Sequence, residues 1–124
     1  MNKKVLVVDD NDTNRKMAAY LLSKSGFDVS VANGSMEAIS MIDDCQPDLI
    51  LMDVQMPDMD GYELTRHLKS NPLTKSIIIV ALTALALRGE GDRAAEAGCD
   101  GYISKPFDTR ELPKQVRGYL HVAA

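Results

Sequence analysis

Aspartates that directly follow apolar runs are the residues of this sequence best suited to chemistry. Asp9 and Asp10 end one apolar run and Asp53 ends another, while Thr83 and Lys105 follow two further runs. Carboxylates crowded together repel one another, and a divalent cation offsets that repulsion. The cation and a lysine ammonium would together attract a phosphoryl group, which an aspartate carboxylate can accept as a nucleophile. These residues therefore predict a Mg²⁺-dependent site for an anionic group around Asp53.

Each of these residues also has an ordinary structural use. An aspartate at a strand-to-helix junction commonly caps the helix, and Asn11 and Asp12 in the first loop favour that interpretation. Thr83 can likewise cap a helix, and Lys105, which precedes Pro106, can be a solvated lysine in a turn. Their joint occurrence after several strands favours a shared site, because the carboxyl ends of parallel strands meet at one edge of the sheet.

Five short runs rich in Val, Ile and Leu alternate with longer segments of helical period, which indicates a parallel sheet covered on both faces. The runs span residues 5–8, 28–32, 48–52, 77–82 and 101–104. The first, third and fourth runs are almost uninterrupted apolar, as central strands are, whereas the second and fifth are mixed, as edge strands usually are. The sequence therefore predicts an α/β fold, an open doubly wound (βα)5 sandwich, for which the flavodoxin-like arrangement with strand order 2-1-3-4-5 is one of two common solutions.

Five helices are expected after these strands, each with a recognisable boundary. The boundaries are Gly26 at the end of the first helix, Ser35 and Gln46 around the second, Asn71 near the end of the third, Gly98 at the end of a fourth over residues 93–97, and Asp108 or Thr109 as the cap of the fifth. Pro113 falls in or just past the first turn of the fifth helix. We expect it to remove one hydrogen bond and delay the start of that helix.

The composition is that of one acidic globular domain. The chain has 124 residues, with 14 Lys and Arg against 18 Asp and Glu, for a net charge of −4. This balance disfavours binding to nucleic acid or to an anionic membrane. The apolar run before Asp9 is too short for a signal peptide, and no other run approaches membrane-spanning length, so we expect a cytoplasmic protein without membrane insertion. Cys45 and Cys99 are expected to be reduced, partly buried thiols.

Four motifs resemble those of bacterial response-regulator receiver domains, the CheY-like phospho-acceptor half of two-component signalling. They are VLVVDD at 5–10, DLILMDVQMPDMDG at 48–61, ALTA at 81–84 and YISKP at 102–106. The resemblance covers the chain from Lys4 to about His121. Residues 81–93 and 97–106 are also similar to stand-alone regulators of the DivK type, which act in the cell cycle and cell division, and to receivers of hybrid histidine kinases.

The receiver resemblance implies a role for each residue of the site. Asp9, Asp10, Asp53 and the backbone carbonyl of Gln55 would bind Mg²⁺, with Mn²⁺ able to replace it. Asp53 would accept a phosphoryl group from a histidine kinase or a histidine phosphotransferase, as one step of a phosphorelay. The Thr83 hydroxyl would hydrogen-bond the phosphoryl oxygens.

The resemblance also implies a switch and an output surface. Lys105 would pair with the phosphoryl oxygens and join Pro106 through a cis peptide bond, and Tyr102 would change its orientation when Thr83 moves. A downstream effector protein would bind the face made by the fourth helix, the fifth strand and the fifth helix. Since the sequence ends directly after the fifth helix, we expect a single receiver domain over residues 1–124 without an output domain, acting as a monomer or weak dimer.

Two other function classes use a similar fold. A phosphatase of the haloacid-dehalogenase kind also forms an aspartyl phosphate with Mg²⁺, but it places a second acid two residues after the nucleophile, where this sequence has Gln55. An FMN carrier needs hydroxyl and amide donors in the first loop, where Asp9, Asp10 and Asp12 would repel a phosphate. We therefore expect no enzyme activity beyond the chain's own Mg²⁺-dependent phosphorylation and dephosphorylation.

Overall fold

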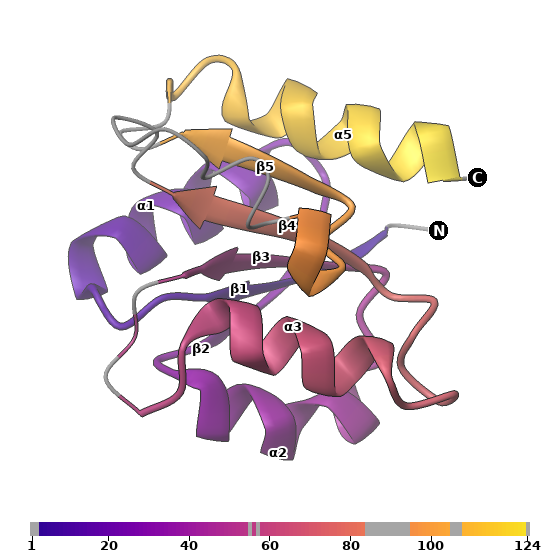
Figure 1. Ribbon diagram of the computed structural model, residues 1–124. Helices are drawn as coiled ribbons and strands as arrows, with labels where there is room; N and C mark the ends of the chain where they lie inside the picture. Colours follow the sequence, from indigo (N-terminus) through magenta and orange to yellow (C-terminus); the bar gives the residue numbers. More distant parts are fainter. Residues whose placement is uncertain (1–2, 55, 57, 84–94, 105–107, 124) are drawn as a thin grey trace.

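A five-stranded parallel sheet runs through the centre of the molecule (Figure 1). Its strands are β1 (Lys4–Val8), β2 (Asp28–Ala32), β3 (Leu49–Asp53), β4 (Ile78–Thr83) and β5 (Gly101–Ser104). The strand order is β2-β1-β3-β4-β5, which confirms the prediction. The computed structural model describes residues 3–54, 56, 58–83, 95–104 and 108–123, with the backbone alone over 121–123.

The position of each strand in the sheet follows from its composition. Every residue of β3 is buried, and in β1 and β4 only the first residue is not. The edge strands β2 and β5 are mostly exposed or half-buried, as their mixed sequences predicted. Five strand boundaries differ by one residue from the prediction: β1 begins at Lys4, and β3 and β4 each begin and end one residue later than expected. Both strands include as their last residue a predicted site residue, Asp53 in β3 and Thr83 in β4.

Helices cover both faces of the sheet. They are α1 (Asp12–Lys24), α2 (Ser35–Cys45), α3 (Gly61–Lys69) and α5 (Leu112–Ala123). The helices α1 and α5 lie on one face, and α2 and α3 lie on the other (Figure 1). Successive strand residues point to opposite faces, so Leu51 packs with α1 and α5 while Ile50 and Met52 pack with α2 and α3. The core therefore has two halves separated by the sheet.

Three helix ends carry a residue with left-handed backbone. Gly26 follows α1 with a φ of 99°, and Gly98 follows the helical residues 95–97 with a φ of 100°, as both predicted boundaries require. The start of the predicted fourth helix, at 93 and 94, lies outside the described residues. Gln46 ends α2 with a φ of 46°, and its N–H donates to the Ile42 carbonyl. The predicted stop is confirmed, although a left-handed glutamine was not foreseen.

The last helix begins later than its cap, as predicted. The Asp108 carboxylate accepts from the Arg110 N–H at 2.8 Å, and its carbonyl accepts from the Leu112 N–H at 2.9 Å. Residues 109–111 form turns and α5 starts at Leu112. Pro113 has no N–H to donate to the Thr109 carbonyl, which explains why the helix does not start sooner. In the described part of the chain, no helix has the length and apolar character needed to cross a membrane.

Two aspartates tie neighbouring strands together at the amino edge of the sheet, where the strands begin. The Asp48 N–H donates to the Lys4 carbonyl and the Asp48 carboxylate accepts from the Lys4 N–H, both at 2.8 Å. Asp100 forms the same pair of bonds with Ile79, again at 2.8 Å, and its carboxylate also accepts from Lys69 Nζ at 2.9 Å. These bonds satisfy main-chain groups that would otherwise be left at the end of the sheet.

Candidate functional site

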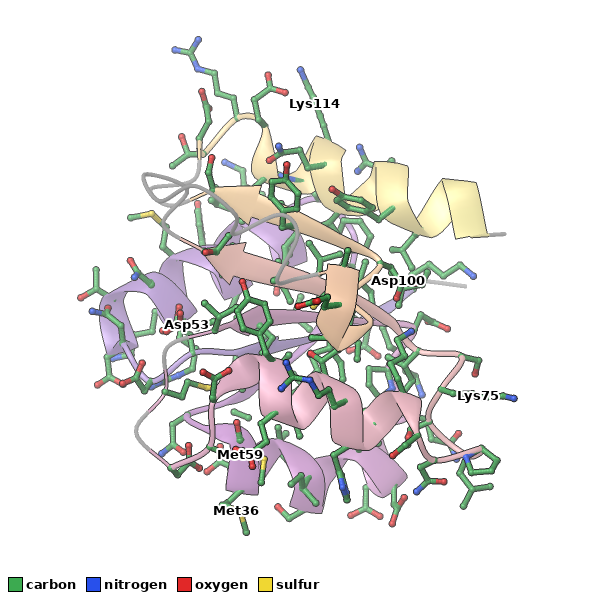
Figure 2. The ribbon with its side chains drawn as sticks, in the orientation of Figure 1. Met36, Asp53, Met59, Lys75, Asp100 and Lys114 are labelled. Carbon is green, nitrogen blue, oxygen red and sulfur yellow. The ribbon has the colours of Figure 1, made fainter. Side chains whose placement is uncertain are left out.

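The predicted acidic residues meet at the carboxyl edge of the sheet, where the strands end. The pairing of β1 with β3 aligns Val8 with Met52, so Asp9 and Asp53 lie at neighbouring strand ends. One carboxylate oxygen each of Asp9, Asp10 and Asp53 lies within 4.8 Å of the other two. Figure 2 shows Asp53 at the arrowhead end of the strands. Three acids separated by up to 44 positions in the sequence therefore form one cluster.

Asp9 is held in place by several hydrogen bonds. Its side chain is buried, with 1% exposure, and its N–H donates to the Ala32 carbonyl at 3.1 Å. One carboxylate oxygen accepts from the Asn11 N–H at 2.9 Å, and the main-chain carbonyl accepts from the Arg15 guanidinium at 3.0 Å. Asp10, by contrast, has an exposed side chain. The cluster therefore combines one fixed acid with one that faces solvent.

The cap of α1 is Asn11 and not the aspartate pair. Its side chain accepts from the Asn14 N–H at 2.9 Å, which satisfies one of the donors at the start of the helix. The capping interpretation of Asp9 and Asp10 is thus met by a neighbouring residue. Both aspartates are left in the acidic cluster, which is what the shared-site interpretation predicted.

Asp53 sits between the acidic pair and the hydroxyl of the next strand. It is 4% exposed, and the β3–β4 register aligns it with Leu82, the residue before Thr83. Thr83 is also buried, with 2% exposure. The Val54 N–H donates to the Leu82 carbonyl at 3.2 Å, which extends the contact between the two strands past Asp53. The strand ends therefore place the acid and the hydroxyl on adjacent strands.

Gly61 brings α3 against Asp53, a contribution that the sequence analysis missed. A Cβ at Gly61 would lie 2.6 Å from the Asp53 carbonyl oxygen and 2.7 Å from the Val54 Cα, both main-chain atoms. The Gly61 N–H donates to the Val54 carbonyl at 2.9 Å, and Asp60 caps the helix by accepting from the Tyr62 N–H at 2.7 Å. An Asp-Gly pair before a helix was the available signal. The close approach requires glycine at this position.

Asp58 joins the loop after Asp53 to the start of α2, a contact that sequence reasoning also missed. Its carboxylate accepts from the main-chain N–H groups of Met36 at 2.9 Å and Ser35 at 3.3 Å. The Ser35 hydroxyl donates to the Met59 carbonyl at 2.8 Å, and Figure 2 shows Met36 and Met59 close together. The Met36 N–H is the main cause that lowers the pKa of the Asp58 carboxyl, partly opposed by desolvation. Helix α2 has no side-chain cap of its own at Gly34, so Asp58 supplies it from 22–23 residues away.

The remaining predicted residues lie toward β5. The β4–β5 register aligns Thr83 with Ser104, so the chain leaves β5 at the same edge. Tyr102 is 41% exposed, and its carbonyl accepts from the Tyr119 hydroxyl at 3.1 Å, which links β5 to α5. Lys105, Pro106 and Gln55, together with the predicted cis bond, lie outside the described residues.

The acidic cluster fits a hard divalent cation. Oxygen ligands bound to Mg²⁺ at about 2.1 Å lie roughly 3 Å apart when adjacent and about 4 Å apart when opposite. The carboxylate oxygens of the cluster, within 4.8 Å of one another, are close to those separations. The donors are all carboxylates, the class that Mg²⁺ prefers, and the exposure of Asp10 leaves room for bound water. Asp9, Asp10 and Asp53 are therefore the residues that would hold the ion.

Comparison with known proteins agrees with this geometry. Residues 5–117 match the response regulator receiver domain family. The polar-differentiation response regulator DivK of Brucella ovis is 36% identical over 120 residues, which is 97% of this chain and 98% of that protein. The chemotaxis response regulator CheY4 of Vibrio cholerae has a TM-score of 0.90 at 28% identity, covering 96% of this chain and 99% of that one. The receiver domain of a signal transduction histidine kinase from Syntrophus aciditrophicus has a TM-score of 0.88 at 32% identity, covering 97% of this chain and 91% of that one.

The chain belongs to the response regulator receiver family of two-component systems. Its fold is CheY-like, and its sequence is DivK-like over nearly its whole length.

Proposed function

We propose that this chain is a phosphorylation-dependent signalling switch in a phosphorelay. Asp53 accepts a phosphoryl group from the phosphohistidine of a histidine kinase or a histidine phosphotransferase. The observation that carries the proposal is the gathering of the Asp9, Asp10 and Asp53 carboxylate oxygens within 4.8 Å at one edge of the sheet. A cluster of this kind costs repulsion, which Mg²⁺ bound with the help of the Gln55 carbonyl offsets.

The transfer asks little covalent chemistry of the protein. An Asp53 carboxylate oxygen forms the bond to phosphorus while the bond from phosphorus to the donor's histidine nitrogen breaks, and the nitrogen keeps the electron pair. A divalent cation, Mg²⁺ or Mn²⁺, would be held by Asp9, Asp10 and Asp53 and would supply positive charge beside the phosphoryl oxygens, with which the Lys105 ammonium pairs. Thr83, next to Asp53 across the β3–β4 pair, donates its hydroxyl to one of them. The same site catalyses the later hydrolysis of the aspartyl phosphate by water.

The proposed output is a protein contact at the face formed by residues before β5, by β5 and by α5. A phosphoryl group adds about 1.5 to 2 negative charges, enough to draw the Thr83 hydroxyl toward Asp53. The exposure of Tyr102 on β5 and the bond from the Tyr119 hydroxyl of α5 to the Tyr102 carbonyl support a role for Tyr102 in the response. An effector protein that binds this face would read the change, with the chain acting as a monomer or weak dimer.

The likeness to a polar-differentiation regulator supports a role in cell-cycle or cell-division control. Because this chain covers 98% of that relative, we propose that it acts as a single stand-alone receiver over residues 1–124. The likeness to a receiver from a histidine kinase supports a second arrangement, in which it is part of a longer kinase. The mass of the native protein in its source cell separates the two. Cys45 and Cys99 are both free thiols, which supports work in a reducing compartment such as the cytoplasm.

The test is incubation with acetyl phosphate, with and without Mg²⁺, followed by intact-mass measurement. One phosphoryl group per chain is expected, dependent on Mg²⁺, sensitive to hydroxylamine and absent from Asp53→Ala. The Asp100→Asn variant, changed at the opposite edge, is the matched control and should label like the wild type. A phosphoryl group that persists in Asp53→Ala, or no labelling of the wild type, overturns the proposal. Many turnovers on a simple phosphate ester would instead favour a phosphatase.

A further inference from the structure

Arg15 is a cation placed beside a cluster of acids that it does not neutralise directly. It lies in the first turns of α1, and its side chain is only 14% exposed. One guanidinium nitrogen donates to the main-chain carbonyl of Asp9 at 3.0 Å, and the other forms an ion pair with the Asp12 carboxylate. The guanidinium therefore bridges the strand end that carries the acidic pair and the helix that follows it.

The carbonyl that Arg15 holds belongs to the peptide between Asp9 and Asp10. The orientation of this peptide sets how the two carboxylates are placed relative to each other. The Asp9 N–H is already fixed by the Ala32 carbonyl, and one Asp9 carboxylate oxygen by the Asn11 N–H. The bond from Arg15 adds a further restraint on Asp9, and it acts on the link to Asp10.

We propose that Arg15 is a positioning residue for the divalent cation, holding the peptide between Asp9 and Asp10 so that both carboxylates face the ion. This inference rests on the proposed function, because it concerns the same Mg²⁺ site. Groups that orient metal ligands without touching the metal commonly change affinity by 10- to 100-fold when they are removed. Arg15 acts on the ligands through the main chain, by its bond to the Asp9 carbonyl.

Charge alone gives the opposite expectation. Removing a positive side chain near a cation site lowers the repulsion of Mg²⁺ and leaves Asp12 without its ion pair, so electrostatics predicts tighter binding. Positioning predicts weaker binding, because the acidic pair loses its restraint. The sign of the change in Mg²⁺ affinity therefore separates the two effects. Lys16, the next residue and an exposed one, offers a control with the same charge.

The experiment is a titration of the folded protein with Mg²⁺ at fixed ionic strength. Binding is measured by calorimetry and by the amide NMR shifts of residues 9–12. Arg15→Met is expected to weaken Mg²⁺ binding by about tenfold, the lower end of that range. Arg15→Lys, which keeps one donor for the Asp9 carbonyl, should recover part of the loss. Lys16→Met should bind Mg²⁺ as the wild type does or slightly tighter. Asp12→Asn, which keeps the bond from Arg15 to Asp9, should stay close to the wild type.

Unchanged or tighter Mg²⁺ binding by Arg15→Met overturns the inference and leaves the proposed function standing. A wild-type protein that binds no Mg²⁺ overturns the proposed function, and the inference with it. A general loss of structure is detected by circular dichroism in the same samples. Should Arg15→Met not fold, the folded Arg15→Lys decides, since it must bind Mg²⁺ more weakly than the wild type while Lys16→Met does not.

Discussion

Aspartates stand at both edges of this sheet, and only at the carboxyl edge do the described ones also form a carboxylate cluster. At the amino edge, Asp48 and Asp100 each exchange two hydrogen bonds with the main chain of the neighbouring strand. At the carboxyl edge, the carboxylates of Asp9, Asp10 and Asp53 lie within 4.8 Å of one another. Figure 2 shows Asp53 and Asp100 at opposite ends of the strands.

This comparison shows that the groups around an aspartate, and not its residue type, distinguish a structural role from a functional one. An aspartate that accepts main-chain N–H groups stabilises the fold with its charge in place. An aspartate placed against other carboxylates carries a repulsion that only a cation or a proton removes. The amino edge therefore holds the strands together, and the carboxyl edge is prepared for a ligand.

One cleft lined by described residues lies away from the acidic cluster. A cleft of about 330 Å³ lies at the amino edge, between the end of α2 and the turn after α3. Its lining is Ile42, Asp43, Gln46, Pro47, Leu73, Thr74, Ser76 and Ile77, in which Asp43 is the single ionisable residue. The acidic cluster is at the other edge of the sheet, so this cleft is separate from the proposed phosphoryl site.

The largest expected effect comes from changing one aspartate at each edge of the sheet and comparing the two variants. Asp53→Asn should abolish Mg²⁺ binding and should not lower the free energy of unfolding in Mg²⁺-free buffer, because it removes repulsion. Asp100→Ala should keep the Mg²⁺ affinity but lower the free energy of unfolding by about 1–2 kcal/mol, because the partly buried Ile79 N–H loses its acceptor. Urea denaturation with and without Mg²⁺ measures both. Equal changes in Mg²⁺ affinity and in the free energy of unfolding in the two variants would contradict the distinction between the two edges.

Glycine substitutions give the next largest effect. Gly61→Ala, at the carboxyl edge, forces a Cβ against main-chain atoms of Asp53 and Val54, at a cost of about 1–3 kcal/mol. For Gly101→Ala, at the amino edge, the three atoms nearest to the new Cβ all belong to the Tyr119 side chain, which can rotate away. Gly61→Ala should have a lower free energy of unfolding than Gly101→Ala. Adding Tyr119→Ala should relieve the clash in Gly101→Ala and leave the clash in Gly61→Ala unchanged. Equal stability of Gly61→Ala and the wild type would show that α3 does not press against Asp53.

The cap from Asp58 to α2 predicts a smaller, pH-dependent effect. The Met36 N–H lowers the pKa of Asp58 below its ordinary value of 3.8. The contribution of the Asp58 carboxylate to the free energy of unfolding is therefore complete above pH 3.8 and is lost as the pH falls through the lowered pKa. Asp58→Asn should be less stable than the wild type at pH 7, by about 1 kcal/mol, and the gap should close below pH 3.8. Asp44→Asn, on the exposed side of α2, controls for the change of charge. A gap that persists unchanged in acid would contradict the cap.

The smallest effect concerns a thiol and leaves the fold unchanged. Burial raises the pKa of Cys99, although the thiol also donates to the Thr65 hydroxyl oxygen at 3.7 Å. In Cys45→Ser, where Cys99 is the remaining thiol, the native protein should react with a disulfide reagent at pH 8 more slowly than the urea-unfolded protein does. Equal rates would mean that Cys99 is accessible in the native state.

Patterns local in sequence predicted most of the fold. Uninterrupted apolar runs identified the three central strands, mixed runs identified β2 and β5, and the glycines at 26 and 98 ended helices where predicted. The acidic cluster was also predictable, because each of its residues follows an apolar run and all parallel strands end at one edge.

Contacts between distant segments could not be predicted in the same way. The roles of Asp48, Asp58 and Asp100 depend on main-chain N–H groups 21 to 44 residues away, and nothing in their local sequence separates them from ordinary turn residues. Gly61 and Arg15 were overlooked for a similar reason. A close approach to Asp53 and a bond to the Asp9 carbonyl become visible only when the strand ends and helices are in place.

The most direct measurement is the position of the phosphoryl group after reaction with acetyl phosphate and Mg²⁺. Borohydride reduces an aspartyl phosphate to homoserine, and peptide mass spectrometry then locates that residue in the chain. We predict homoserine at position 53 alone, and aspartate at every position when Mg²⁺ is replaced by a chelator. Homoserine at position 9 or 10, or a stable phosphoryl group that borohydride does not convert, would contradict the assignment of Asp53 as the acceptor.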